Sequence, residues 1–430
     1  MAQLIDHPLR HATASELHAR PFPNISAPAR AAFFAYTSAQ NDSGRDEAAD
    51  RAHFLRLLDY YDMAYPADTE SHFFGQLGEV WLKWECHTEF VTYTAFVDGL
   101  GDRAFDGSEF SIFPADWQAA MPGTILSSTS IRVEKDQDTQ SIKDKLEGWF
   151  VSESLAASRV LDSAAVIAGD YRMDDNGNMR FALFVPPTTG RRRVGRIVQR
   201  LNEIEVYKTM SMLGLMRARA LSVELNAVDT NLSALVADLA DDQVSAEDNL
   251  NGLLQLSADL EGHSAAVAYR FSASKAYAAI VAQRIEVLRE TQFEGRQTFR
   301  EFMMRRFDPA MRTVQALDNR LQDLISRAIR TGDLLRTRVD VERQTQNQEL
   351  LSSMNRRADV QLQLQRTVEG LSVVAISYYA TGLSLYVLMP LSDIIGMTKG
   401  ILTAAVVPLV IGSVYLALRR IRKRNEPNAS

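Results

Sequence analysis

The chain has 430 residues, a formal net charge of −7 and one cysteine, Cys86. This length is enough for a large core and for more than one structural unit. The acidic charge argues against nucleic acid as a partner, and a single thiol excludes a disulfide within the chain. Residues 1–20 contain no apolar stretch of signal-peptide length, so we expect the bulk of the chain to stay in the compartment where it is made.

Residues 1–30 are polar and interrupted by prolines, and we interpret them as an N-terminal arm. His7, His11 and His18 occur in this arm at spacings that could place them on one helix face. No cysteine or carboxylate cluster completes a metal site there. The alternative is an ordered arm that packs on the body of the protein through local ion pairs.

Residues 31–190 predict an α+β or α/β domain with a mixed or antiparallel sheet. Asn176-Gly177 favours a tight hairpin turn, because both residues tolerate positive φ. The surrounding segment slightly resembles a calcium-binding loop but lacks its last acidic ligand. The expected elements are helices within 45–65 and around 143–158, and strands within 76–97, 131–134, 164–171 and 179–185.

Three ionisable residues within this domain are candidates for a site. Strand alternation over residues 82–90 places Glu85, His87 and Glu89 on one face. They could bind a divalent metal ion or perform acid–base chemistry. The alternative is an ordinary solvated face of a sheet. The chain has no GxGxxG, P-loop or nucleophile elbow, so we predict neither an enzyme nor a cofactor.

Residues 191–307 predict a helical layer that packs on the upper part of a stalk. Between 194 and 239 apolar residues recur at alternating steps of three and four, which is typical of packed helices. Asp241-Asp242 interrupts the pattern. It then continues to about Phe307, with a second interruption expected near Gly262.

A stalk helix is expected over residues 308–370, running on into the next segment. Asp308-Pro309 is a strong start signal, and no proline follows until Pro390. A helix of about 80 residues would be roughly 120 Å long, too long for one globular core. From Asp340 to Gln365 the stalk is polar. It could line a wet channel between identical helices, be exposed to water, or supply polar core positions that set register. The candidates for lining such a channel are Gln346, Asn347, Asn355 and Gln361.

Two uncharged segments, residues 371–391 and 401–418, are long enough to cross the roughly 30 Å of a bilayer core. The nine-residue connection 392–400 is too short for a domain, so the two segments predict a transmembrane hairpin. Arginines precede the first segment, and a basic tail, 419–430, follows the second. By the positive-inside rule, we expect both termini and the large domain on the cytoplasmic side of the membrane, with 392–400 outside.

Ser377, Thr381 and Ser384 form a hydroxyl stripe at i, i+4 and i+7 of the first crossing. Such a stripe could line a pore, or it could make hydrogen bonds within and between helices. Two crossings cannot enclose a pathway alone, so transport would require a homo-oligomer. We expect the second crossing on the outer, lipid-facing ring.

Three segments carry a resemblance that extends over nearly the whole chain. The sequences HPLRHATASELHARPFP at 7–23, KWECHTEF at 83–90 and the run from Leu334 to Tyr379 resemble a bacterial family of uncharacterised membrane-anchored proteins. The resemblance implies membrane anchoring. It implies no activity and assigns no catalytic residue.

The order of the expected parts is also similar to that of CorA-type divalent-cation channels. That resemblance implies a cytoplasmic domain, a helical layer, a stalk helix and a two-helix hairpin, assembled as a pentamer. The Gly-Met-Asn signature of that family does not follow Leu391. The nearest string is Gly396-Met397-Thr398, which lies in the expected outer loop.

These observations predict a homo-oligomeric inner-membrane protein, built like CorA, that acts as an ion channel or transporter without the signature. Its expected partners are the lipid bilayer, further copies of itself and inorganic ions. The alternative function is a membrane-anchored cytosolic sensor or scaffold.

Overall fold

The computed structural model describes residues 7, 10, 22–37, 45–68, 70–239, 244–395 and 398–425. His11 and His18 of the expected arm, Gly396 and Met397 of the expected loop and residues 426–430 of the expected tail lie outside these residues. The chain divides into two compact units. The first comprises Met1–Val244 with Asp248–Gly332, and the second comprises Ser245–Glu247 with Asp333–Ser430.

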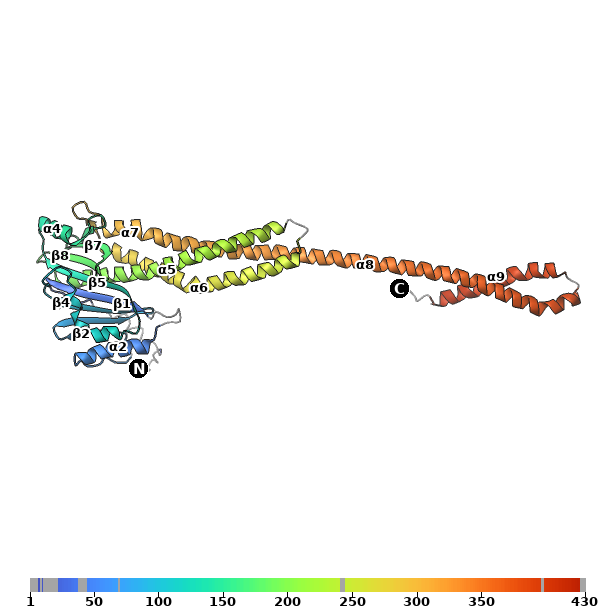
Figure 1. Ribbon diagram of the computed structural model, residues 1–430, viewed down its shortest axis with the longest axis horizontal. Helices are drawn as coiled ribbons and strands as arrows, with labels where there is room; N and C mark the ends of the chain where they lie inside the picture. Colours follow the sequence, from blue (N-terminus) through green and yellow to red (C-terminus); the bar gives the residue numbers. More distant parts are fainter. Residues whose placement is uncertain are drawn as a thin grey trace, which may run out of the picture. The chain divides into compact units, whose positions relative to one another are not determined.

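The first unit is built on a nine-stranded sheet in the order β2-β3-β4-β1-β5-β8-β7-β6-β9 (Figure 1). Its described strand pairs are antiparallel except β5 with β8, so the predicted mixed sheet is confirmed. The strands are β1 (Ala29–Thr37), β2 (His72–Leu77), β3 (Val80–Cys86), β4 (Val91–Asp98), β5 (Thr124–Lys135), β6 (Ala156–Val160), β7 (Ala165–Met173), β8 (Met179–Val185) and β9 (Thr291–Gln292).

Strand β1 lies in the interior of this sheet, between β4 and β5. It begins at Ala29, so the end of the expected N-terminal arm belongs to the core of the domain. Its sequence, ARAAFFAYT, is a nearly continuous apolar run, as expected for a strand covered on both faces. Ala31 faces one buried cluster, and Phe34 and Tyr36 face another.

Several predicted elements differ from the structure. The segment 76–97 was expected to hold one or two strands, but it contains β3, most of β4 and the end of β2. The expected helix around 143–158 ends earlier, because α4 (Thr139–Trp149) is followed by β6. The hairpin at Asn176-Gly177 is confirmed. Gly177 has φ of +82°, and the Asp174 carboxylate accepts hydrogen bonds from two backbone N–H groups of the turn.

Helices cover both faces of the sheet. One face packs against α2 (Glu47–Tyr60) and α3 (Ala115–Ala119), next to the short 3₁₀ helix η1 (Ser108–Ile112), and against α4. The other face packs against α5 (Arg191–Asp238), α6 (Ala246–Glu286) and α7 (Phe299–Arg306). This arrangement agrees with the predicted α+β class.

The interruption expected near Gly262 is wrong, since α6 continues through this residue. The helical pattern breaks instead between Glu286 and Phe299, where the chain returns to the sheet and forms β9 beside β6. The Glu290 carboxylate then accepts hydrogen bonds from the Phe299 and Arg300 N–H groups, and so satisfies free donors at the start of α7.

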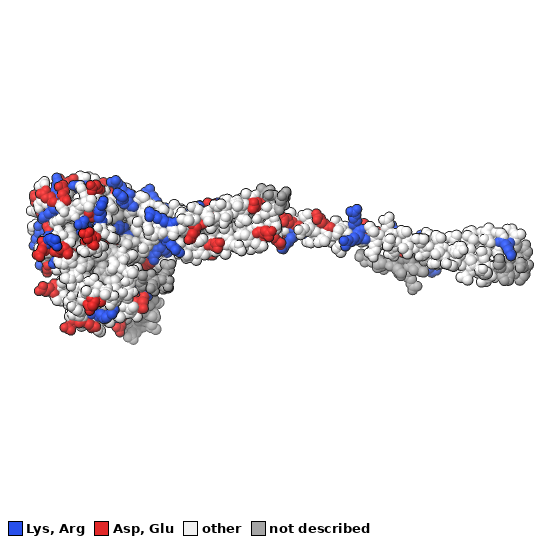
Figure 2. Space-filling view, viewed as in Figure 1, with Lys and Arg blue, Asp and Glu red and all other residues white. Residues whose placement is uncertain are grey.

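The long helix predicted from Asp308 is confirmed as α8 (Asp308–Ile395), and α9 (Lys399–Asn425) follows it. Within the described residues, these two helices are long and apolar enough to cross a membrane. Few charged side chains show on the surface of these apolar segments (Figure 2). In the second unit, every residue of α8 from 343 to 371 is exposed.

Candidate functional site

The three predicted site residues do not form one cluster. The Glu89 carboxylate contacts Arg270 and accepts a hydrogen bond from the Tyr277 hydroxyl at 2.6 Å, both on α6. Glu85 instead forms an ion pair with Lys83 at 3.0 Å. Strand β3 ends at Cys86, so the alternation on which the grouping rested stops before His87. Among the residues that the structure describes, no group of three or more His, Cys, Asp or Glu could hold a metal ion.

The alternative of a solvated sheet face is wrong as well. The side chains of Lys83 and Glu89 are 4% and 8% exposed. Lys83 donates a hydrogen bond to Gln199 on α5, and Glu89 is held by α6. These helices therefore bury the charged face of β3, and a buried polar region lies between the sheet and the helical layer.

A cavity of about 330 Å³ occupies this region, and we name it the seam cavity. It is lined by Phe33, Lys83, Glu85, Thr92, Thr94 and Phe96 from the sheet, by Gln199, Arg200, Asn202, Glu203, Val206 and Tyr207 from α5, by Arg284 and Val287 at the end of α6, and by Phe22 and His87.

Strand register explains why polar side chains meet at the cavity. Thr94 of β4 lies opposite Lys83 of β3, and Thr92 lies opposite Glu85. Since side chains of paired residues project from the same side of a sheet, all four face α5. Thr92 and Thr94 are only 4% and 6% exposed, so these polar side chains are buried between the sheet and α5.

Helix α5 completes the cavity with Gln199, Asn202 and Glu203, which share one face of the helix. Gln199 accepts a hydrogen bond from Lys83 at 3.3 Å and donates one to Glu203 at 2.8 Å. The other oxygen of the Glu203 carboxylate contacts Arg284 of α6. A continuous polar chain therefore runs from the sheet to α6 along the cavity wall.

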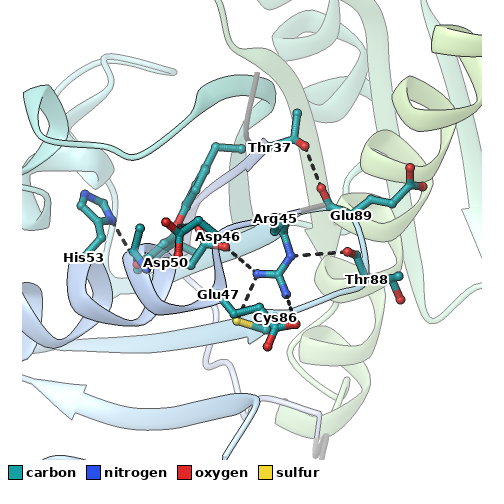
Figure 3. Close-up of polar contacts among 12 residues, drawn as sticks. Thr37, Arg45, Asp46, Glu47, Asp50, His53, Cys86, Thr88 and Glu89 are labelled. Atoms are coloured by element: carbon teal, nitrogen blue, oxygen red, sulfur yellow. Dashed lines mark hydrogen bonds and ion pairs between the residues drawn. The ribbon is translucent and has the colours of Figure 1, made fainter. Parts of the chain in front are cut away.

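A second cavity, of about 610 Å³, shares His87 and Tyr207 with the first. Arg45 lies on its wall with a side chain only 6% exposed. Its guanidinium contacts the Asp50 carboxylate at 2.6 Å, and Asp50 also accepts a hydrogen bond from the Tyr36 hydroxyl. Figure 3 shows Arg45 among its polar neighbours. Burial raises the pKa of Asp50, an effect that Arg45 and Tyr36 oppose. This group of side chains compensates a buried charge.

Cys86 lies in the second cavity, with its Sγ atom 3.7 Å from Arg45 Nη1. Burial nevertheless raises the pKa of the thiol, and this effect exceeds the opposing effect of Arg45. The thiolate is the reactive form of cysteine. The thiol is thus a poor nucleophile at neutral pH.

The hydroxyl stripe lies at the hairpin of α8 and α9. Ser377 and Thr381 line a cavity of about 710 Å³ together with Val407 and Ile411 of α9. Ser377 is 6% exposed, and its hydroxyl has no hydrogen-bond partner among the described residues. Ser384 is partly exposed, and the four polar stalk candidates, Gln346, Asn347, Asn355 and Gln361, are exposed in the single chain. Pore lining by these residues stays a prediction.

Sequence reasoning missed Arg45 and the α5 side of the seam cavity. One signal was present, since Asn202 and Glu203 interrupt the apolar series Ile197, Leu201 and Ile204. Polar residues within a packed helical face often mark a buried polar site. Nothing local indicated Arg45, because its partners become neighbours only through the fold.

The fold is that of a mixed α+β protein with a very long helix, α8. Both α8 and α9 carry apolar segments. A family model described as a protein of unknown function (DUF3422) matches residues 5–425, and the chain belongs to this family. This confirms the resemblance to an uncharacterised family. Comparison with curated proteins found no match. Comparison with solved structures found none either.

Proposed function

We propose that the protein is a homo-oligomeric inner-membrane ion channel or transporter, built like CorA but without the Gly-Met-Asn signature. The observation that supports it most is the stretch of α8 from 343 to 371, which is exposed on every side in one chain. This stretch includes Leu350 and Met354, each more than 60% exposed. Isolated helices are marginal in water, and identical helices packed together would cover such residues.

The same helix continues directly into an apolar segment, which supports a membrane location. In this proposal α8 and α9 cross the bilayer as a hairpin. Arg356 and Arg357 precede the first crossing, and Arg419 and Arg420 follow the second. The positive-inside rule then places both termini and the sheet domain in the cytoplasm.

Conduction in the assembly would follow the axis of the α8 helices. Ser377, Thr381 and Ser384 supply hydroxyl groups within the crossing, and the exposed Gln346, Asn347, Asn355 and Gln361 supply amides along the stalk. Polar groups of this kind can replace part of the hydration shell of an ion. A pentamer is the expected assembly.

The test is ion flux in liposomes containing the purified full-length protein. Uptake of at least one of Mg²⁺, K⁺, Na⁺ or Cl⁻ above empty vesicles is expected. A double change of Thr381→Val and Ser384→Val should lower the flux by about tenfold or more, since each loses a hydroxyl in the path. Thr403→Val on α9 is the matched control and should leave the flux unchanged. Absence of flux for all four ions contradicts the proposal.

A second candidate function is a membrane-anchored cytosolic sensor or scaffold. The position of Ser377 and Thr381 favours it, because they line one cavity with Val407 and Ile411 of α9 and so lie on the side of α8 that is turned toward the other helix of the hairpin. Replacing residues 371–418 by an unrelated two-helix anchor separates the two functions. If the chimera restores the function that a deletion strain has lost, the sensor or scaffold is supported. A channel would not be restored, because the chimera lacks its pathway.

A further inference from the structure

Three side chains that line the seam cavity carry hydrogen-bond donors with no acceptor among the residues that the structure describes. Asn202 is 4% exposed, and its Oδ1 atom accepts a hydrogen bond from the Thr129 hydroxyl at 2.7 Å. Its Nδ2 group has no acceptor among the residues that the structure describes, and the side-chain hydroxyls of Thr92 and Thr94 have no partner there either. None of these three groups is among the fully buried side-chain atoms that lack a partner, so each is open to the cavity and can donate to an acceptor that occupies it.

Of the three described Lys and Arg side chains that line the cavity, two are held in ion pairs. Lys83 is paired with Glu85, and Arg284 is paired with Glu203. The remaining cation is Arg200, whose guanidinium donates a hydrogen bond to the Val287 carbonyl at 3.2 Å. Within the described part of the chain it forms no ion pair with a carboxylate. Burial, together with the nearby charge of Arg196, lowers the pKa of Arg200, and the Glu203 carboxylate only partly opposes this effect. An anion next to this guanidinium would relieve both effects.

The rest of the wall is apolar and aromatic. Phe33, Phe96 and Val206 line the cavity beside the polar groups, and Phe22 and Val287 line it near Arg200. A volume of about 330 Å³ is at the small end of the range for ligand pockets. This combination fits a compact molecule with one charged end and an apolar body.

We propose that the seam cavity binds a small organic anion, with its charge beside Arg200 and its apolar body against Phe33 and Phe96. The oxygen atoms of its carboxylate or phosphate group accept hydrogen bonds from the unpaired donors of Thr92, Thr94 and Asn202. The site lies entirely in the first unit and does not depend on ion conduction, so it would serve a channel or a sensor equally.

The experiment is calorimetric titration of the full-length protein in detergent micelles at constant ionic strength. The probes are benzoate and phenyl phosphate, with benzamide as a neutral molecule of matched shape. Saturable binding of at least one anion below about 10 mM is expected, with benzamide at least about tenfold weaker. No saturable binding of either anion in this range overturns the proposal, and so does equal binding of benzamide.

Variants locate the binding. Arg200→Gln should weaken anion binding by about tenfold or more, because the substitution removes the guanidinium that forms no ion pair among the described residues. Arg193→Gln, on the exposed first turn of α5, removes the same charge outside the cavity and should change affinity by less than about twofold. Thr94→Val keeps the side-chain shape and should weaken binding about threefold or more, which tests the site even if Arg200→Gln does not fold. Wild-type affinity in Thr94→Val, or in folded Arg200→Gln, places the anion elsewhere and overturns the proposal, as does equal weakening in Arg193→Gln.

Discussion

Two stretches of α8 differ sharply in their surroundings. Within the first unit, between Asp308 and Gly332, the helix buries Leu321, Leu324 and Ala328 in its own chain. Within the second unit, from 343 to 371, it buries nothing. Both stretches have the composition of a helix, so helix formation does not distinguish them. What differs is the supply of partners. The first stretch finds them within one chain, and the second must find them in water or in another copy.

The packed unit should be most sensitive where a charge is buried. Arg45→Met removes the guanidinium that compensates Asp50, whose side chain is 1% exposed. An uncompensated buried charge is costly, so the free energy of unfolding should fall by about 4 kcal/mol. Chemical denaturation of the full-length protein in detergent measures it.

Arg289→Met provides the matched control. Arg289 follows α6 and pairs with Asp162, and both side chains are more than half exposed. Exposed pairs contribute little, so we expect a loss of about 1 kcal/mol or less. Equal losses in the two variants would mean that Arg45 acts through packing rather than through its charge.

A direct comparison within α8 comes next. Leu321→Ala should lower the free energy of unfolding by about 3 kcal/mol, because it opens a cavity in the packed stretch. Leu350→Ala, in the exposed stretch, should change the unfolding of a single chain by less than about 0.5 kcal/mol. Its expected effect is on assembly, seen as a shift toward smaller species in light scattering. A stability loss in Leu350→Ala as large as that in Leu321→Ala, with assembly unchanged, would remove the distinction between the two stretches.

The packed unit should also lose stability in acid through His53. This residue is buried beside Trp117, and its pKa is lowered to about 4 because burial disfavours the imidazolium. In the unfolded chain its pKa is about 6.5, so the unfolded state binds more protons between these values. The free energy of unfolding should therefore fall by about 3 kcal/mol from pH 6.5 to pH 4 on account of this group.

Other groups titrate over the same range, so the wild type must be compared with His53→Gln. The variant should lose this share of the pH dependence, and His72→Gln on β2 should keep it. An unchanged pH dependence in His53→Gln would show that His53 is protonated without cost in the folded state.

The smallest effect is expected at the hairpin. The Ser377 hydroxyl is buried without a partner among the described residues, so Ser377→Ala should stabilise the full-length protein by about 1 kcal/mol. Thermal unfolding in detergent measures the change. A loss of stability would instead mean that assembly supplies a hydrogen-bond partner for this hydroxyl.

Local signals in the sequence were sufficient to predict α8, because Asp308-Pro309 marks its start and no further proline occurs before Pro390. They were also sufficient for the hairpin at Gly177, whose conformation depends on the turn residues themselves. β1 was missed, although its nearly continuous apolar run is typical of a buried strand.

The seam cavity could not be predicted, since its wall is assembled from distant segments. Lys83 and Gln199 are separated by 116 residues, and Glu89 and Arg270 by 181. Period-two alternation gave the correct face for Lys83 and Glu85, but it gave no information on what covers that face. A charged face toward solvent and a charged face toward a polar helix have the same pattern.

The short strand β9 has a consequence for biosynthesis. It pairs with the outer side of β6, and further along that side Ala157 donates a backbone hydrogen bond to Gln297. On the ribosome, the free edge of β6 therefore stays open until the segment up to Gln297 has left the exit tunnel. An open strand edge invites pairing with other chains. The sheet is therefore complete only after both α5 and α6 have been synthesised. A chain truncated within α6 would expose an aggregation-prone edge.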